Sequence, residues 1–406
     1  MGFAQGLTPP RLRASACAEM IKRLPPAEWT RREDLAKLVA ALGDGNARYV
    51  GGAVRDTLLG VEAHDIDIAT PLEPVEVIAR LDDAGIRSVP TGLKHGTITA
   101  IREGDNVEIT TLRRDVSTDG RHAEVAFSND WQEDAARRDF TINALYADPA
   151  TLEVFDWFGG LDDLRDKRVR FIGDAHQRIR EDHLRILRYF RFQARFGSQP
   201  ADDEAEAACA ELASTLKGLS RERIGWELQN LLALADPAPT VARMAELGVL
   251  GTILPEADPH GLARLIEAET REDFDPDPIR RLAALLPPDP LAAEQVAARL
   301  RLSIAQKKRL ILAARRNEAS EPRALAYRIG HEAALDRLLL AGVETAALKG
   351  WHAPFFPLKG GAIVARGVAA GPEVAHILRA VEAQWIAEGF PDEDRVAHLL
   401  DTALVG

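Results

Sequence analysis

Two aspartates in a short apolar run are the residues of this chain best placed to hold a metal ion. Asp65 and Asp67 belong to the segment HDIDI (residues 64–68), which as a strand points both carboxylates to one face and both isoleucines to the other. Like charges side by side disfavour a strand, and a divalent cation bound by hard carboxylate oxygens removes that conflict. We therefore expect Mg²⁺ here, held against a nucleoside triphosphate. The alternative is a solvated edge strand with two surface aspartates.

A glycine pair precedes these aspartates, in RYVGGAVRDTLLG (residues 48–60). After a strand at 48–50, Gly51 and Gly52 predict a turn that lets the backbone approach a ligand closely. A short helix is expected at 53–59, closed by Gly60. Free amides at its start bind phosphate oxygens, and Arg55 adds a charged fork one turn further on. Gly52 and Arg55 are thus candidate phosphate-binding residues.

Two later segments also carry polar side chains where chemistry is possible. Glu108 lies in the middle of a strand-like run with apolar neighbours, so it faces away from them. It either orients a metal or activates an attacking hydroxyl, or it is simply the polar face of an edge strand. In RRDFTINAL (residues 137–145), Asn143 follows Asp139 by one helical turn, so the two can share a face. The alternative there is a helix start capped by Asp139.

These segments resemble the class II nucleotidyltransferases, the family of the CCA-adding enzymes of tRNA and the bacterial poly(A) polymerases. The resemblance covers residues 46–235 in the family's order, about half of the chain, and the C-terminal third carries no matching block. Besides the glycine–aspartate segment, the blocks are VEITTLRRDVSTDGRHAEVAF (107–127), RRDFTINAL (137–145), DWFGGLDDLRDKRVRFIGD (156–174) and REDHLRILRYFRFQARFG (180–197). The resemblance implies an α/β nucleotidyltransferase head domain followed by an all-α helical remainder.

The resemblance also implies roles within the second and third blocks. Arg138 is expected to contact the triphosphate, with Asp139 and Asn143 near the sugar, although the choice between Arg137 and Arg138 stays open. Residues 113–125 are polar and turn-rich, and we expect neither a strand nor a long helix there. Their position resembles the flexible loop thought to help switch from C to A addition, and the alternative is a plain surface connection.

The last block is expected to form a helix at residues 180–192, in which Asp182, Arg185 and Arg188 recur every three residues. The resemblance assigns Asp182 and Arg185 to reading the incoming base, with Arg188 and Arg191 close by. Cytosine and adenine both present an amine donor beside a ring-nitrogen acceptor, which a carboxylate and a guanidinium match. Uracil and guanine present the reverse order. The alternative is a salt-bridged surface helix in which Glu181 pairs with Arg185.

The expected function is template-independent addition of C, C and A to the tRNA 3′ end from CTP and ATP, with release of pyrophosphate. Asp65 and Asp67 then hold Mg²⁺ while the 3′-hydroxyl attacks the α-phosphate. One rival is a poly(A) polymerase or a partially adding enzyme of the same superfamily, against which the lack of a basic C-terminal tail counts. The rival from another class is a catalytically silent RNA-binding protein, against which the two intact aspartates count.

Composition and hydrophobic periodicity along the chain predict how these elements are divided into domains. We expect an N-terminal arm (1–27), a catalytic head (28–166), a helical neck (167–236) and an all-α body and tail that bind tRNA (237–406). No membrane-spanning or secretory pattern is evident, which predicts a cytoplasmic protein. The sequence does not fix the oligomeric state, and a monomer is favoured.

The net charge of −12 is unusual for a protein that binds nucleic acid, so local basic groups must provide the contacts. Two such groups stand out, of which the second could equally be an ordinary solvated helix face. They are Arg178, Arg180, Arg185, Arg188, Arg191 and Arg195, and then Lys307, Lys308, Arg309, Arg315 and Arg316.

Overall fold

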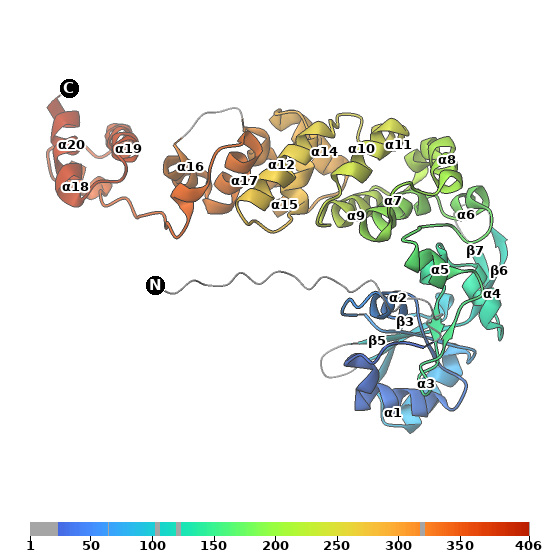
Figure 1. Cartoon of the computed structure of the whole chain (residues 1–406). Helices are drawn as coiled ribbons and strands as arrows, with labels where there is room; N and C mark the ends of the chain where they lie inside the picture. Colours follow the sequence, from blue (N-terminus) through green and yellow to red (C-terminus); the bar gives the residue numbers. More distant parts are fainter. Residues whose placement is uncertain (1–22, 64, 102–105, 119–122, 317–320, 406) are drawn as a thin grey trace, which may run out of the picture. The chain divides into compact units, whose positions relative to one another are not determined.

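The computed structural model describes residues 23–63, 65–101, 106–118, 123–316 and 321–405. By its internal contacts the chain forms two compact units. The head unit comprises residues up to 185 together with 196–212, and the helical unit comprises 186–195 together with 213–406. Figure 1 shows the strands in the blue to blue-green part of the chain and helices alone in the yellow to red part. The predicted α/β head followed by an all-α remainder is confirmed.

In the described part of the chain, a seven-stranded mixed sheet forms the centre of the head unit, in the order β3-β4-β5-β2-β1-β8-β9. Neighbouring strands run antiparallel except β2 and β5, which are parallel. The strands are β1 (Arg48–Val50), β2 (Asp67–Thr70), β3 (Ser88–Gly92), β4 (Thr97–Ala100), β5 (Val107–Thr111), β8 (Tyr146–Ala147) and β9 (Val154–Phe155). A separate hairpin pairs β6 (Arg113–Thr118) with β7 (Ala123–Phe127).

The two faces of this sheet differ in polarity. Ile68, Ile98 and Ile109 are fully buried register neighbours on one face. Helix α3 (Pro74–Asp83) contacts β3 and β4, and α1 (Glu33–Leu42) contacts α3. Because side chains alternate along a strand, Glu108 points to the face opposite Ile109, and its register partner Asp67 shares that face. The apolar face therefore anchors the strands that present the two carboxylates.

Short helices complete the head unit between and after the strands. They are η1 (Trp29–Arg31), α2 (Gly52–Leu58), η2 (Leu93–His95), α4 (Trp131–Ala136), η3 (Thr141–Asn143), α5 (Gly160–Arg165), α6 (Ala175–Glu181) and α8 (Asp203–Glu211).

The helical unit is a succession of packed helices, two of which begin at a proline that follows a capping aspartate. Asp277 and Asp289 cap the helices that begin at Pro278 and Pro290, because a carboxylate accepts the free N–H groups there and proline needs none. The helices are α7 (Arg185–Phe196), η4 (Ala213–Gly218), α9 (Arg221–Leu232), α10 (Ala238–Glu246), α11 (Val249–Ile253), α12 (His260–Arg271), α13 (Pro278–Leu285), α14 (Pro290–Arg299), α15 (Ile304–Ala314), α16 (Pro322–Ile329), α17 (His331–Ala341), η5 (Ala346–Leu348), α18 (Gly360–Val364), α19 (Pro372–Ala387) and α20 (Glu393–Val405). None of the helices in the described ranges is long and apolar enough to cross a membrane.

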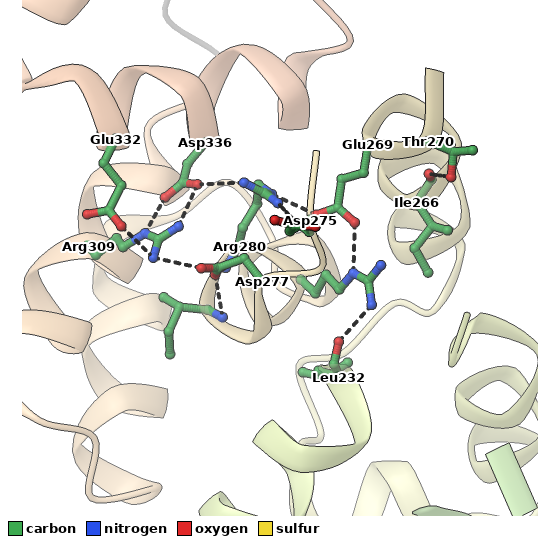
Figure 2. A network of polar contacts seen from close by, with 12 residues as sticks. Leu232, Ile266, Glu269, Thr270, Asp275, Asp277, Arg280, Arg309, Glu332 and Asp336 are labelled. Atoms are coloured by element: carbon green, nitrogen blue, oxygen red, sulfur yellow. Dashed lines mark hydrogen bonds and ion pairs between the residues drawn. The ribbon is translucent and has the colours of Figure 1, made fainter. Parts of the chain in front are cut away.

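A buried network of charges joins α12, α13, α15 and α17 (Figure 2). Glu269 accepts from Arg280 Nε at 2.7 Å and from Arg281 Nε at 2.8 Å. Arg309 forms a two-pronged pair with Asp336, with distances of 2.6 and 2.9 Å. Glu269, Arg281 and Asp336 are each only 1% exposed. Every carboxylate of this set therefore has a guanidinium partner inside the helical unit.

Two sequence-based expectations about the backbone of the catalytic segments are wrong. The strand expected at 64–68 begins at Asp67, so Asp65 precedes it in irregular backbone, and His64 lies outside the described residues. Of residues 113–125, expected to form no strand, 113–118 belong to β6 and 123–125 to β7, while 119–122 lie outside the described residues. That segment contains Val116, Thr118 and Val125, residue types that favour strands when a partner strand supplies the ladder.

The helix expected at 180–192 is also interrupted. Helix α6 ends at Glu181 and α7 starts at Arg185. Asp182 has extended backbone (φ −149°, ψ 106°), and its carboxylate accepts the N–H of Leu184 at 3.1 Å. Aspartate side chains compete in this way with helical hydrogen bonds. Asp182 and Arg185 therefore meet across a turn and not along one helix face.

Candidate functional site

Three carboxylates gather where β2 begins. Asp67 opens β2, and Glu108 is its partner in the parallel register of β5. Asp65 lies two residues before Asp67 and is exposed. Burial and the negative charges of Glu108 and Asp65 raise the pKa of Asp67 to about 6, while the charge of Arg138 opposes that rise. Like charges are thus held together here, and a bound cation would relieve their repulsion.

The donor set suits a hard cation that shares its ligands with a substrate. Among the described residues, no group of three or more His, Cys, Asp or Glu side chains is arranged to hold a metal ion by itself. Mg²⁺ is usually held by one or two carboxylates, with phosphate and water oxygens completing its shell. Asp65 and Asp67 fit that pattern, because they provide two carboxylates and leave the remaining positions to a nucleotide.

One buried carboxylate, that of Asp134, positions both arginines of the RRDF segment. It accepts from Arg137 Nε at 2.9 Å and from Arg138 Nη2 at 3.3 Å. The Tyr146 hydroxyl donates to Asp134 at 2.5 Å and accepts from Arg138 Nε at 3.0 Å. Burial favours the neutral acid, but the charges of the two arginines and the tyrosine hydrogen bond lower the pKa of Asp134 to about 2. Of the two arginines, Arg138 is the one whose charge acts on Asp67.

A second chain of hydrogen bonds joins α2 to η3. Arg55 Nη1 donates to Asn143 Oδ1 at 2.5 Å, and Asn143 Nδ2 donates to Asp139 Oδ1 at 3.0 Å. Arg55 also pairs with Asp56 at 2.7 Å, and its guanidinium lies 4.2 Å from the ring centroid of Phe196. The structure thus brings Arg55, Asp139 and Asn143 together. Because Arg55 is only 5% exposed, its fork is held in one orientation.

The glycine turn lies against both arginine positions. Gly51 has φ of 70°, a left-handed conformation that side chains rarely adopt. A Cβ atom at Gly51 would lie 3.4 Å from Arg138 Nη1, and one at Gly52 would lie 3.7 Å from Arg55 Nη2. Gly52 is the first residue of α2, as the sequence predicted to within one residue. The turn therefore keeps open the space between backbone amides and the two guanidinium groups.

Arg185 is anchored to the RRDF segment at the start of α7. Its Nη1 donates to Glu181 at 2.6 Å and to the Arg178 carbonyl at 2.8 Å. Its Nη2 donates to the Arg137 carbonyl at 3.1 Å. The ion pair between Glu181 and Arg185, noted as the alternative from the sequence, is therefore present. It holds the guanidinium at Glu181 and two main-chain carbonyls and does not use all of its N–H groups.

Arg188 and Arg191 lie in the helical unit and share one buried partner. Glu227 of α9, 1% exposed, accepts from Arg191 Nε at 2.7 Å and lies 3.7 Å from Arg188 Nη1. An unpaired carboxylate at that depth would be costly, so Glu227 holds both arginines against α9.

The second basic group does not form one uniform surface. Lys307 pairs with a glutamate of α14 at 2.8 Å, and Arg309 belongs to the buried network. Arg316 donates to a main-chain carbonyl of α13 at 3.1 Å. Lys308 and Arg315 are exposed. The alternative of a solvated helix face thus describes only part of this group.

Comparison with known proteins places this geometry in a family. Residues 47–170 match the poly A polymerase head domain, and residues 202–260 match the probable RNA and SrmB-binding site of polymerase A. The chain is 39% identical over 368 residues to the mouse protein named CCA tRNA nucleotidyltransferase 1, mitochondrial, covering 84% of this chain and 83% of the relative. This chain belongs to the CCA tRNA nucleotidyltransferase and poly(A) polymerase family. It is a nucleotidyltransferase, and enzymes of its family generally use a divalent metal ion.

Bacterial members of the nucleotidyltransferase family are similar as well. The CCA-adding enzyme of Leuconostoc citreum is 40% identical over 209 residues, covering 51% of this chain and 50% of that enzyme. The Bacillus stearothermophilus CCA-adding enzyme solved with CTP is 25% identical, with a TM-score of 0.71, covering 92% of this chain and 98% of that one. The Thermotoga maritima enzyme solved with tRNA is 21% identical with a TM-score of 0.69, covering 95% of this chain and 97% of that one, which shows the shared fold.

Two residues of this nucleotidyltransferase were missed by sequence reasoning, although both organise the candidate site. Asp134 holds the RRDF arginines, and Glu227 holds Arg188 and Arg191. A signal existed for Asp134, because it precedes the two arginines by three and four residues in a helix. No local signal existed for Glu227, which lies 36 residues after Arg191.

Proposed function

We propose that this chain adds C, C and A in turn to the 3′ end of tRNA, using CTP and ATP without a template. One arrangement supports the proposal beyond the family. The positive charge of Arg138 opposes the rise in the pKa of Asp67, the proposed metal-binding carboxylate, and the carbonyl of the preceding Arg137 accepts a hydrogen bond from Arg185 Nη2 at 3.1 Å. Arg137 and Arg138, which are consecutive, thus connect the proposed phosphate-binding residues with the proposed base-reading residues. These two sets would contact opposite ends of one bound nucleotide. The relatives named CCA-adding enzymes support the same activity.

The side chains around Asp67 fit in-line attack of a 3′-hydroxyl on the α-phosphate. Asp65 and Asp67 would hold Mg²⁺, which would supply positive charge at the reacting phosphate. Glu108, the register neighbour of Asp67, accepts the proton of the hydroxyl or orients the carboxylates around it. Arg138 and Arg55 balance the charge of the triphosphate and of the leaving pyrophosphate.

The remaining polar residues orient the sugar and the base. Asp139 and Asn143 contact the ribose, since their hydrogen-bonded chain leads to Arg55. Asp182 accepts from the base amine, and Arg185 donates to the ring nitrogen, an order that cytosine and adenine share. Arg188 and Arg191 extend the positive charge along α7.

Incorporation into tRNA that lacks its 3′ end tests this proposal. Labelled CTP and ATP are supplied together and singly, and the product ends are sequenced. Three added nucleotides in the order C, C, A support the proposal. A long run of A identifies a poly(A) polymerase, and products that stop after CC or gain only A identify a partial enzyme. Tight tRNA binding without incorporation identifies a silent RNA-binding protein.

Domain roles and location are part of the same proposal. Residues 28–166 form the catalytic head, 167–236 the neck, and 237–406 a body and tail that bind tRNA. The N-terminal arm expected at 1–27 lies outside the described residues except for 23–27. Residues 113–125 take part in the change from C to A addition. The proposed location is cytoplasmic, although the mouse and human relatives are named as mitochondrial. Fractionation of cells producing a tagged full chain tests the location.

A further inference from the structure

Trp226 is the exposed member of the chain's six tryptophans, all of which lie in described ranges. Its side chain is 57% exposed on α9, whereas Trp29 and Trp385 are 7% and 2% exposed. A single exposed apolar side chain is ordinary and by itself indicates nothing. The surroundings of this ring are the informative feature.

The ring of Trp226 is held beside a fixed guanidinium. The Arg191 guanidinium carbon lies 5.8 Å from the Trp226 ring centroid and 4.9 Å from that of Phe192. The Arg188 guanidinium carbon lies 5.4 Å from the Phe192 centroid. Glu227, the residue next to Trp226, pairs with both arginines and so draws them to α9. These four residues, Arg188, Arg191, Phe192 and Trp226, are called the Trp226 platform below.

The chemistry of the platform suits an unpaired nucleobase. The platform places two guanidinium groups, which share the buried carboxylate of Glu227, next to an exposed aromatic side chain. Proteins that bind single-stranded nucleic acid combine these two features, because every base has a stacking face and every linkage a negative phosphate. In a chain with a net charge of −12, a local positive site of this kind also counters general repulsion of RNA.

The position of the platform along α7 matches the end of a primer. Arg191 follows Arg185 by six residues in one helix, which corresponds to about 9 Å along the helix axis. Stacked nucleotides advance by roughly 3.4 Å each, so this distance spans two to three nucleotides. The bases within that reach of the incoming nucleotide are the last unpaired bases of the RNA that is being extended.

We propose that the Trp226 ring stacks on an unpaired base at the 3′ end of the RNA primer, with Arg188 and Arg191 neutralising its phosphates. The inference rests on the proposed function and deepens it, because it assigns a binding surface to the primer and not to the incoming nucleotide. Trp226 is thus a positioning residue, and its loss acts on RNA binding before it acts on chemistry.

Binding of RNA hairpins to the full chain, without nucleotides, tests the proposal directly. Two hairpins share one stem, and only one carries unpaired 3′ nucleotides. Fluorescence anisotropy should show that Trp226→Ala weakens binding of the tailed hairpin roughly five- to hundredfold, the usual effect of losing one stacked base. Binding of the blunt hairpin should not change, and Trp226→Phe should restore most of the loss. Equal weakening for both hairpins, or none for either, overturns the proposal.

Phe355→Ala is the matched control, since Phe355 is 98% exposed in the same helical unit and belongs to no part of the platform. It should leave both affinities unchanged, and thermal melting of all variants checks that each is folded. In steady-state assays, Trp226→Ala should raise KM for the RNA and leave KM for CTP unchanged. A rise in KM for CTP alone places the ring on the incoming base and overturns the proposal. Failure of wild type to incorporate C, C and A overturns the proposed function, while the hairpin assay still judges Trp226.

Discussion

At the start of β2 the head unit holds the like charges of Asp67 and Glu108 side by side, whereas the helical unit surrounds buried Glu269 with two arginines. The first arrangement raises the pKa of Asp67 to about 6. The second gives each buried carboxylate a hydrogen-bonded partner at less than 3 Å.

The difference shows which charges serve folding and which serve chemistry. A folded protein gains nothing from adjacent carboxylates, so their presence marks a place where a ligand is expected to complete the structure. A buried pair that is already complete has no capacity left for a ligand and fixes the relative positions of helices. Removal of a charge should therefore have opposite consequences in the two regions.

The largest effect is expected at the unpaired carboxylates. Asp65→Ala combined with Asp67→Asn should lower CTP and ATP incorporation alike by roughly a thousandfold, since a metal contributes several kcal/mol to the transition state. Thermal stability should not fall, because the changes remove repulsion and no partner. Retention of more than a few per cent of activity would show that these residues do not hold the metal.

The next effect is one on stability, at the paired charges. Glu269→Gln should lower the free energy of unfolding by about 3–5 kcal/mol, because buried Arg281 loses its carboxylate partner and Arg280 keeps only Asp336, at 3.6 Å. Denaturant unfolding measures the loss. Glu388→Gln, which breaks a surface pair with Arg395 of 2.8 Å, is the control and should change the free energy of unfolding far less, because solvent screens an exposed pair. Similar losses in both variants would remove the distinction drawn between the network and ordinary ion pairs.

An intermediate effect is expected at Arg185, because some N–H groups of its guanidinium are hydrogen-bonded within the protein and others remain for a base. Exchanging Asp182→Arg with Arg185→Asp reverses the order of acceptor and donor, so preference should move toward UTP and GTP by roughly ten- to a hundredfold per contact. Overall turnover should fall as well, because Glu181 and two carbonyls lose their donor. The ratio of nucleotides incorporated is the quantity to measure. An active exchanged enzyme that still prefers CTP and ATP would show that other residues read the base.

The smallest effect concerns pH. Since the folded state raises the pKa of Asp67 from 3.8 to about 6, its protonated form favours folding. That contribution is complete below about pH 4 and is lost as pH rises through 6. In metal-free protein, Asp67→Asn should therefore gain stability relative to wild type between pH 4 and pH 7. Melting curves across this range measure the gain, and a constant difference would contradict the shared-charge geometry. Added Mg²⁺ should stabilise wild type and not the variant.

Much of the fold could be predicted because its signals are local. The strands near residues 48–50, 97–100 and 107–111 follow β-rich runs, and the helix starts at Pro278 and Pro290 follow capping aspartates. The errors arose where side chains override the pattern. The Asp182 carboxylate accepts the N–H of Leu184 and so interrupts the expected helix. The charged segment that begins at Arg113 forms a strand, β6, because it pairs with β7.

Local signals predicted only part of the candidate site. Asp67, Arg55 and Asn143 stand in short motifs whose spacing indicates their chemistry. Glu227 instead depends on a contact between α7 and α9, which no local pattern reports. The second basic group depends on a distant contact in the same way, since Arg309 pairs with a carboxylate 27 residues further along.

The charged network of the helical unit also limits how this sequence can diverge. Each residue of the network is the ion-pair partner of at least one other, so a single replacement leaves an uncompensated charge. A joint replacement by apolar residues of similar volume can leave the stability unchanged. The effect of a change at Arg281 thus depends on which residue stands at position 269. Divergence at these positions should proceed by linked replacements, and related sequences should either keep the whole set or have exchanged it together.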